Sequence, residues 1–86
     1  MTEDAETRIK RLKMRSWRRG IKEMDLILGN FADAELASID AATLDDYERL
    51  LEENDWDLYY WVTGAQVTPD PYAALIKRLA VFHKIG

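Results

Sequence analysis

The sequence predicts an all-α protein, a small single-domain bundle of about five short helices. Apolar residues recur at the three- and four-residue spacing of a helix face, and no stretch shows the apolar–polar alternation of a strand. Only two prolines and four glycines interrupt the 86 residues, and 48% of the residues are hydrophobic. A chain of this length builds one hydrophobic core. We therefore expect one domain over residues 1–86, with a disordered tail at residues 1–4.

The first two predicted helices meet at a glycine. Residues 5–19 are rich in helix formers, and Gly20 interrupts their pattern. The spacing of a core-facing helix restarts at Ile21, and Gly29-Asn30 is a candidate break within that second helix. One stripe of the first helix is basic and consists of Arg8, Arg11, Arg15 and Arg18.

Capping signals delimit the remaining helices. Thr43-Leu-Asp-Asp46 resembles a capping box, and Asn54 can cap the following helix, which Gly64 ends. Asp70-Pro71 is a favourable start for the last helix. The predicted core positions of these helices are Leu44, Tyr47, Leu50, Leu51, Leu58, Trp61, Val62, Tyr72, Leu75, Ile76, Leu79 and Phe82.

Charge is distributed unevenly, although the net charge is only −4. Residues 1–22 hold eight basic side chains and three acids, whereas residues 23–76 hold thirteen acids and Arg49 alone. A basic first helix on an acidic body either packs against that body or docks an acidic partner. The acidic body argues against nucleic-acid binding, because phosphates would be repelled over most of the surface.

Targeting and membrane signals are not recognisable in this sequence. Residues 1–8 are acidic, without the apolar region of a secretory signal or the arginine and serine of a mitochondrial transit peptide. No apolar run approaches the roughly 20 residues that cross a bilayer. We therefore expect a cytoplasmic protein without membrane insertion.

Catalytic chemistry has little support in the sequence. The chain has no cysteine and no phosphate-binding glycine loop. His83, the only histidine, lies on or beside the apolar stripe of the last helix, which is typical of a packing or surface residue. Acid pairs such as Glu52-Glu53 are common on solvated helix faces. We expect a protein that is not an enzyme and that binds no metal.

Four aromatic residues lie within six positions, at Trp56, Tyr59, Tyr60 and Trp61. Trp61 has helical spacing from Leu58 and is predicted to face the core. One thin helix cannot turn all four rings inward, so at least one of the other three should be exposed. Exposed aromatic side chains are favoured as anchors in protein–protein contacts.

Residues 18–25, RRGIKEMD, form the junction between the first two helices. Gly20 as N-cap, with Glu23 reaching back to its amide, fits a capping arrangement, and Asp25 complements the helix dipole. This arrangement explains the glycine and the acids but leaves three cations beside a helix start, where they oppose the dipole: Arg18, Arg19 and Lys22.

The junction brings a known family into view. Arg19-Gly20-x-x-Glu23, followed by Met24-Asp25, LILGNFAD and LLEENDWDLYYWVTG, closely resembles the SdhE family, the FAD assembly factors of succinate dehydrogenase and fumarate reductase. The resemblance runs from about Trp17 to His83. It implies a helical chaperone that binds the flavoprotein subunit of succinate dehydrogenase, with that of fumarate reductase as a further candidate. It further implies that this factor promotes covalent attachment of FAD to its partner and binds no cofactor stably itself.

The resemblance also implies which residues contact the partner. The RGxxE residues Arg19, Gly20 and Glu23 come first, so Arg19→Ala and Glu23→Ala are expected to leave the fold intact and abolish stimulation of flavinylation. Two departures from the family pattern concern this contact: Lys22 stands where members often carry arginine, and α-helical positions 56 and 60 are unusually aromatic. The other residues of the predicted partner contact are Arg18, Lys22, Asp25, Trp56 and Tyr60.

Three alternatives remain open at this stage. The chain could be a generic acidic helical adaptor unrelated to flavin. It could be a nucleic-acid module that uses the arginines between Arg8 and Arg18, in which case its affinity would depend steeply on salt. It could also carry flavin directly on the aromatic cluster, which is the only feature that favours this idea.

Overall fold

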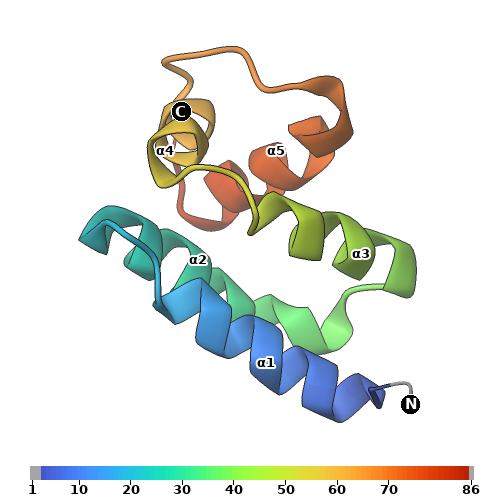
Figure 1. Ribbon diagram of the computed structural model, residues 1–86. Coiled ribbons are helices and arrows are strands. Elements are labelled where there is room, and N and C mark those ends of the chain that lie inside the picture. The colour runs from blue at the N-terminus through green and yellow to red at the C-terminus, as the bar shows by residue number, and fades with distance from the viewer. Residues whose placement is uncertain (1–2, 86) are drawn as a thin grey trace.

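The computed structural model describes residues 3–85 and shows an all-α fold, which confirms the predicted class (Figure 1). Helices α1 and α2 lie side by side, α3 crosses beyond them, and α4 and α5 complete the far side. The helices are α1 (Ala5–Trp17), α2 (Lys22–Glu35), α3 (Ala41–Leu50), α4 (Asp55–Thr63) and α5 (Ala73–Phe82), with short 3-10 turns η1 (Leu36–Ser38) and η2 (Asp70–Tyr72).

Helix α2 is the centre of the packing, since it contacts α1, α4 and α5. Its apolar stripe forms the middle of one continuous core. Every predicted core position of α3 is buried, whereas Trp61, Tyr72 and Phe82 are half-buried and pack against the rim of the core. The buried apolar residues are Leu12, Met24, Ile27, Leu28, Phe31, Ala32, Leu36, Leu44, Tyr47, Leu50, Leu51, Leu58, Val62, Leu75, Ile76 and Leu79.

The starts of α1, α3 and α4 use acid or amide side chains as caps. Asn54 caps α4 as predicted, because its side-chain oxygen accepts the Trp56 N–H at 2.9 Å. Helix α3 starts earlier than predicted, because Asp40 is its cap. The Asp40 carboxylate accepts both the backbone N–H and the hydroxyl of Thr43, at 3.2 and 2.6 Å. Thr43 is thus already inside the helix, and the predicted capping box at Thr43–Asp46 is wrong.

Two further helix boundaries were predicted from glycine and proline. Gly64 ends α4 with a positive φ of 83°, as expected for a glycine at a helix C-terminus. Pro71 does not begin α5 directly, because Asp70–Tyr72 form a separate 3-10 turn in which the Tyr72 N–H bonds the Pro69 carbonyl at 2.9 Å. Helix α5 begins only at Ala73.

The predicted break at Gly29-Asn30 does not occur, because α2 runs through both residues. Gly29 is buried beneath the indole of Trp17 from α1. A Cβ at this position would lie 2.2 Å from Trp17 Cδ2, closer than any real contact. The glycine therefore serves the close approach of α1 to α2 and not a turn.

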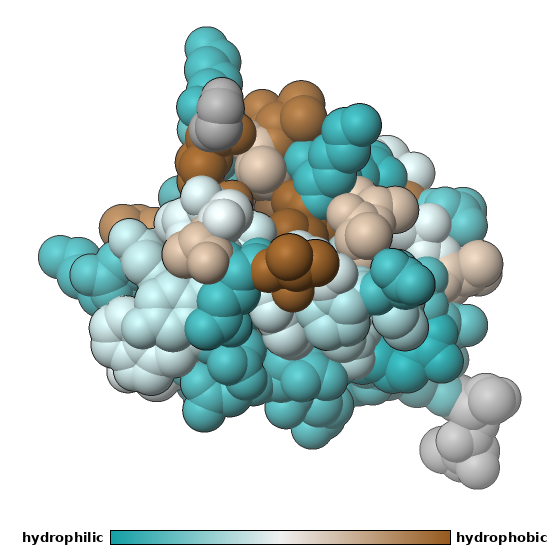
Figure 2. All heavy atoms as spheres, turned by 90° about the horizontal axis from the view of Figure 1, so that it is seen from above, coloured by the Kyte–Doolittle hydropathy of each residue, from teal (hydrophilic) through white to brown (hydrophobic). Residues whose placement is uncertain are grey.

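The face over α4 and α5 is mostly polar, and its apolar side chains form a band from the centre toward one edge (Figure 2). Two exposed valines of this half of the chain are Val67 in the α4–η2 connection and Val81 in α5. Exposed valines are common on protein surfaces, which remain largely apolar in area. We assign no contact to them.

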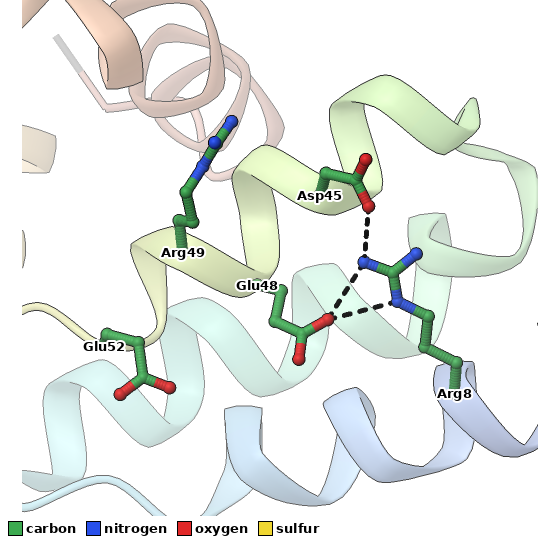
Figure 3. A pocket seen from close by; sticks show the side chains of 5 residues that line it. All are labelled: Arg8, Asp45, Glu48, Arg49 and Glu52. Carbon is green, nitrogen blue, oxygen red and sulfur yellow. Dashed lines mark hydrogen bonds and ion pairs between the residues drawn. The ribbon is translucent and has the colours of Figure 1, made fainter. Parts of the chain in front are cut away.

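The basic stripe of α1 packs against the acidic body of the same molecule. Arg8 bonds Asp45 at 2.7 Å and Glu48 at 2.9 Å, both from α3 (Figure 3). These residues border a shallow depression of about 410 Å³ between α1 and α3. Two further arginines of the stripe are paired in the same way, Arg11 with Glu3 and Glu48, and Arg15 with Glu52.

These pairs perturb the titration of Glu48. Burial alone would raise its pKa, but hydrogen bonds from Arg11 and Arg8 outweigh burial and hold the pKa of Glu48 below its ordinary value. Since Arg8, Arg11 and Arg15 are already paired with acids and only Arg18 of the stripe is not, the α1 stripe offers little free charge to phosphates. This arrangement speaks against the nucleic-acid alternative.

Two smaller expectations concern the start of the chain and the histidine. Residues 1 and 2 of the predicted tail lie outside the described residues, whereas Asp4 caps α1 by accepting the Thr7 N–H at 2.7 Å. His83 is half-buried and donates from Nε2 to the Ile27 carbonyl at 2.7 Å, which fits the packing role predicted for it.

Within residues 3–85, no helix is long and apolar enough to cross a membrane.

Candidate functional site

The predicted contact residues gather where the α1–α2 junction meets the start of α4. Residues 18–21 connect the two helices at one end of the α1–α2 pair, and α4 lies beside this end (Figure 1). The first residue of α4, Asp55, contacts the junction directly. Residues more than 30 positions apart in the sequence therefore form one site.

Arg19 lies inside this site and not on its surface. Its side chain is only 10% exposed, and its Nε donates to Asp55 Oδ1 at 2.7 Å. Its Nη1 and Nη2 donate to the carbonyls of Leu51 and Glu53, at 2.7 and 3.0 Å. These carbonyls follow the end of α3, where backbone acceptors lack helical partners and cations are favoured. The charge that opposes the start of α2 thus stabilises the end of α3.

Gly20 is bound to the same carboxylate. Its backbone N–H donates to Asp55 Oδ2 at 2.5 Å, so one carboxylate holds both residues of the Arg-Gly pair. A Cβ on Gly20 would lie 2.8 Å from Asp55 Oδ2 and would displace that carboxylate from its bond. The close approach that requires glycine here is made by Asp55 of the same chain.

The start of α2 differs from the predicted capping arrangement. Its N-cap is Ile21 and not Gly20, and no side chain bonds the cap. Asp25 carries out the reach-back that was predicted for Glu23: its Oδ1 accepts the Arg19 N–H at 2.6 Å. The physical reason is that the Gly20 N–H already has a partner in Asp55, so the amide that Glu23 would have bonded is occupied.

Three charged side chains of the junction remain exposed. Arg18, Lys22 and Glu23 make no side-chain hydrogen bond and no ion pair with any residue between 3 and 85. Because most other charges near α1 are paired, these three are distinctive. They offer both signs of charge to a partner at the cost of desolvation alone.

The aromatic prediction for α4 is confirmed. Trp56 and Tyr60 are exposed, to 51% and 37%, while Tyr59 is half-buried against the core. The Trp56 and Tyr60 rings lie 6.2 Å apart between centroids, so they cover a single apolar area. Trp56 directly follows Asp55, which places this area next to the junction.

We call the exposed part of this site the junction surface. Two residues of the site are absent from the predicted contact set: Asp55, which holds its parts together, and Leu26, which is 47% exposed one turn beyond Lys22. The predicted contact residues Arg19 and Asp25 are bonded inside the site and do not belong to this surface. Leu26 was detectable in the sequence as the apolar residue outside the core stripe of its helix. The residues of the junction surface are Arg18, Gly20, Lys22, Glu23, Leu26, Trp56 and Tyr60.

Residues 10–83 match the family described as Sdh5, flavinator of succinate dehydrogenase. The chain belongs to this family. The match includes the entire junction, α4 and α5, and it confirms the resemblance seen in the sequence.

Curated relatives of the flavinator family agree with this assignment. Proteins named succinate dehydrogenase assembly factor 2, mitochondrial, from Aspergillus flavus and Meyerozyma guilliermondii are 46% and 49% identical over 71 and 70 residues, or 83% and 80% of this chain. Assembly factor 2-B, mitochondrial, from Drosophila mojavensis is 41% identical over 83 residues, or 94% of this chain. The chain spans only 24%, 52% and 53% of the lengths of these three relatives.

The names of these relatives contradict the predicted location. All three are called mitochondrial, whereas the composition of residues 1–8 predicted a cytoplasmic protein. That prediction is wrong because it relied on the composition of residues 1–8. The composition of a short stretch of chain does not determine the compartment in which a folded domain works.

Proposed function

We propose that this protein is an assembly factor that binds the flavoprotein subunit of succinate dehydrogenase and promotes covalent attachment of FAD to it. The observation that carries this proposal is the family match over residues 10–83, which contains the whole junction surface. The flavoprotein subunit of fumarate reductase is a second client that the same surface would fit.

The protein acts by positioning and not as an enzyme. The names of the relatives, which are called assembly factors, support this non-catalytic role. Bond formation then belongs to the flavoprotein and the flavin. Holding a reactive side chain against its target is worth about 7–11 kcal/mol in well-oriented systems, so a factor without catalytic groups is sufficient. The chain itself binds no FAD stably.

The junction surface supplies the contacts for this role. Glu23 and Lys22 are adjacent, exposed and without partners in the described chain, so each is available to an opposite charge on the flavoprotein. Trp56 and Tyr60 provide apolar area of the kind that anchors protein interfaces. Their desolvation supplies affinity, while the charges supply orientation.

The proposal predicts a specific loss in the Glu23→Ala variant. We expect unchanged folding, since the Glu23 side chain makes no hydrogen bond or ion pair within residues 3–85. The stimulated flavinylation rate should fall by about tenfold and not to zero as the family resemblance implied, because only one charge-assisted contact is lost. The apo-flavoprotein subunit is incubated with FAD and a dicarboxylate, with and without the protein. Covalent flavin fluorescence is then read in a denaturing gel.

The matched control is Glu6→Ala. Glu6 is an exposed glutamate in the first turn of α1, at the opposite end of that helix from the junction. Its removal should leave stimulation unchanged. Equal activity of Glu23→Ala and Glu6→Ala would remove Glu23 from the contact. Binding of the flavoprotein without any stimulation by the unmodified protein would favour the generic adaptor.

A further inference from the structure

We propose that Asp55 is a positioning residue for partner binding: it locks the α1–α2 junction to the start of α4, so that Lys22, Glu23 and Trp56 form one contact surface. The inference deepens the proposed function and rests on it. It also reassigns Arg19, which acts through Asp55 and not by touching the partner.

The geometry of the Asp55 carboxylate carries this inference. Oδ1 accepts from Arg19 Nε at 2.7 Å, and Oδ2 accepts from the Gly20 N–H at 2.5 Å. The side chains of Asp55 and Arg19 are 15% and 10% exposed. Charges this well covered are stable only while each has its partner. Neither side chain can reach a flavoprotein without first breaking the bonds that hold it.

We call the hydrogen bonds of Arg19 and Gly20 to Asp55, Leu51, Glu53 and Asp25 the clamp. Apart from Asp55, its members hold Arg19 from two other directions. Its guanidinium also bonds the Leu51 and Glu53 carbonyls, and its backbone N–H bonds Asp25 Oδ1. The junction is therefore tied to the end of α3, the start of α4 and the first turn of α2. Asp55 is the one member of the clamp whose side chain bonds both residues of the Arg-Gly pair.

The consequence for binding follows from chain connectivity. Gly20 is two residues before Lys22 and three before Glu23, while Asp55 is one residue before Trp56. The Asp55–Gly20 bond thus sets the separation between the charged and the aromatic parts of the surface. A pre-organised surface binds more tightly because less freedom is lost on association. Without the bond, α2 and α4 still pack through the core, but the separation of the two surface parts is less narrowly fixed.

Asp55→Asn tests the role, because the amide keeps the size of the side chain and removes its charge. We expect the flavoprotein concentration for half-saturation to rise by about tenfold, while the flavinylation rate at saturation stays unchanged. The matched control is Asp57→Asn, a second acid in the first turn of the same helix that makes no side-chain bond with residues 3–85. Any loss of dipole stabilisation is similar in the two variants.

A double-mutant cycle separates positioning from a general loss of stability. If Asp55 orients the junction, Glu23→Ala costs less binding in the Asp55→Asn background than in the parent protein. If Asp55 only stabilises the fold, the factors by which Asp55→Asn and Glu23→Ala each weaken binding simply multiply in the double variant. Circular dichroism at the assay temperature checks folding. Should Asp55→Asn unfold, Asp55→Glu keeps the charge and displaces the carboxylate by one methylene, and half-saturation should then rise by about threefold.

The outcomes of this experiment are distinct. The positioning role is overturned if Asp55→Asn and Asp57→Asn reach half-saturation at the same flavoprotein concentration. It is also overturned if the effects of Asp55→Asn and Glu23→Ala on binding multiply. In both cases the proposed function stands as long as the unmodified protein stimulates flavinylation. A fall in the saturated rate without a change in half-saturation also overturns the positioning role. If the unmodified protein neither binds nor stimulates the flavoprotein, the proposed function itself fails.

Discussion

At the scale of single residues, two glycines are required by side chains that approach them from elsewhere in the fold. Gly20 makes room for the Asp55 carboxylate, and Gly29 makes room for the Trp17 indole. Neither has the positive φ that makes Gly64 suitable for its turn. Their roles are therefore steric, and each can be tested together with the side chain that covers it.

Gly29→Ala is predicted to destabilise the protein although alanine is the better helix former by about 1 kcal/mol. The new methyl group would overlap the Trp17 ring, which must move, at a cost of about 1–3 kcal/mol. Urea unfolding measures the change. In a Trp17→Ala background the obstacle is absent, and the same substitution should become stabilising. A destabilisation of equal size in both backgrounds would contradict the explanation.

Arg19 and Arg18 are adjacent arginines with different surroundings, and they form a matched pair. Arg19→Ala removes three side-chain hydrogen bonds and leaves Asp55 without its cation, so we expect a loss of about 1.5–3 kcal/mol. Arg18 is exposed, and Arg18→Ala should change stability by less than about 0.5 kcal/mol. The structure thus replaces the expectation that Arg19→Ala leaves the fold intact. Thermal unfolding of both variants measures the two losses. Equal stability of Arg19→Ala and Arg18→Ala would contradict a stabilising role for the Arg19 hydrogen bonds.

At the scale of elements, α1 is attached to α3 mainly through charged side chains. Arg8, Arg11 and Arg15 reach across to acids on or after α3, whereas the backbone of α1 lies closest to that of α2. Surface ion pairs are individually weak, but Glu48 accepts from two arginines and joins neighbouring pairs into a network. Attachment of this kind should respond to pH and salt.

The Glu48 network predicts a loss of stability in acid. The pKa of Glu48 is lowered in the folded state, so its contribution is present above the unfolded value of about 4.3 and is lost as the pH falls through the lower folded value. Thermal unfolding between pH 7 and pH 2 measures the effect. Glu48→Gln should be less stable at pH 7 and should lose less stability in acid. If the unfolding temperatures of the parent protein and Glu48→Gln fell in parallel from pH 7 to pH 2, a role for Glu48 would be contradicted.

At the scale of the whole molecule, one buried polar group joins three helices. The Tyr47 hydroxyl of α3 lies 2.6 Å from the Ser16 hydroxyl of α1 and 3.4 Å from the Leu28 carbonyl of α2. Ser16 in turn donates to the Leu12 carbonyl at 2.8 Å. Ser16 is fully buried, so the hydrogen bond to Tyr47 keeps its hydroxyl satisfied inside an otherwise apolar core.

Burial raises the pKa of Tyr47 to about 12, against the lowering effect of its bond to Ser16. Because the folded value lies above the unfolded value of about 10, the stability due to the neutral hydroxyl is complete below pH 10 and is lost as the pH rises toward 12. Unfolding midpoints between pH 8 and pH 12 should therefore fall. Tyr47→Phe should cost about 1 kcal/mol at pH 7 and flatten this alkaline decline. If the unfolding midpoint of Tyr47→Phe fell with rising pH as steeply as that of the parent protein, the alkaline loss of stability would belong to other groups.

The existence and order of the helices followed from the sequence alone, because helix formation depends on near neighbours. The apolar spacing, the cap at Asn54 and the glycine at Gly64 act within a few residues and were predicted correctly. The errors at Thr43 and Gly20 have one cause: an acid outside the assumed motif, Asp40 or Asp55, reached the same donor. Several partners compete for one amide, and local spacing does not rank them.

The family was also within reach of the sequence, since the RGxxE motif and the aromatic segment that carry the resemblance are contiguous runs of residues. The contact region stays a prediction. The tertiary structure alone decided the role of each side chain. It paired Arg19 with Asp55, 36 residues away, neutralised the arginines of α1, and left Lys22 and Glu23 exposed. Whether a charge is covered or free depends on which elements pack beside it. That packing is a property of the whole core, because it arises from contacts between segments far apart in the chain.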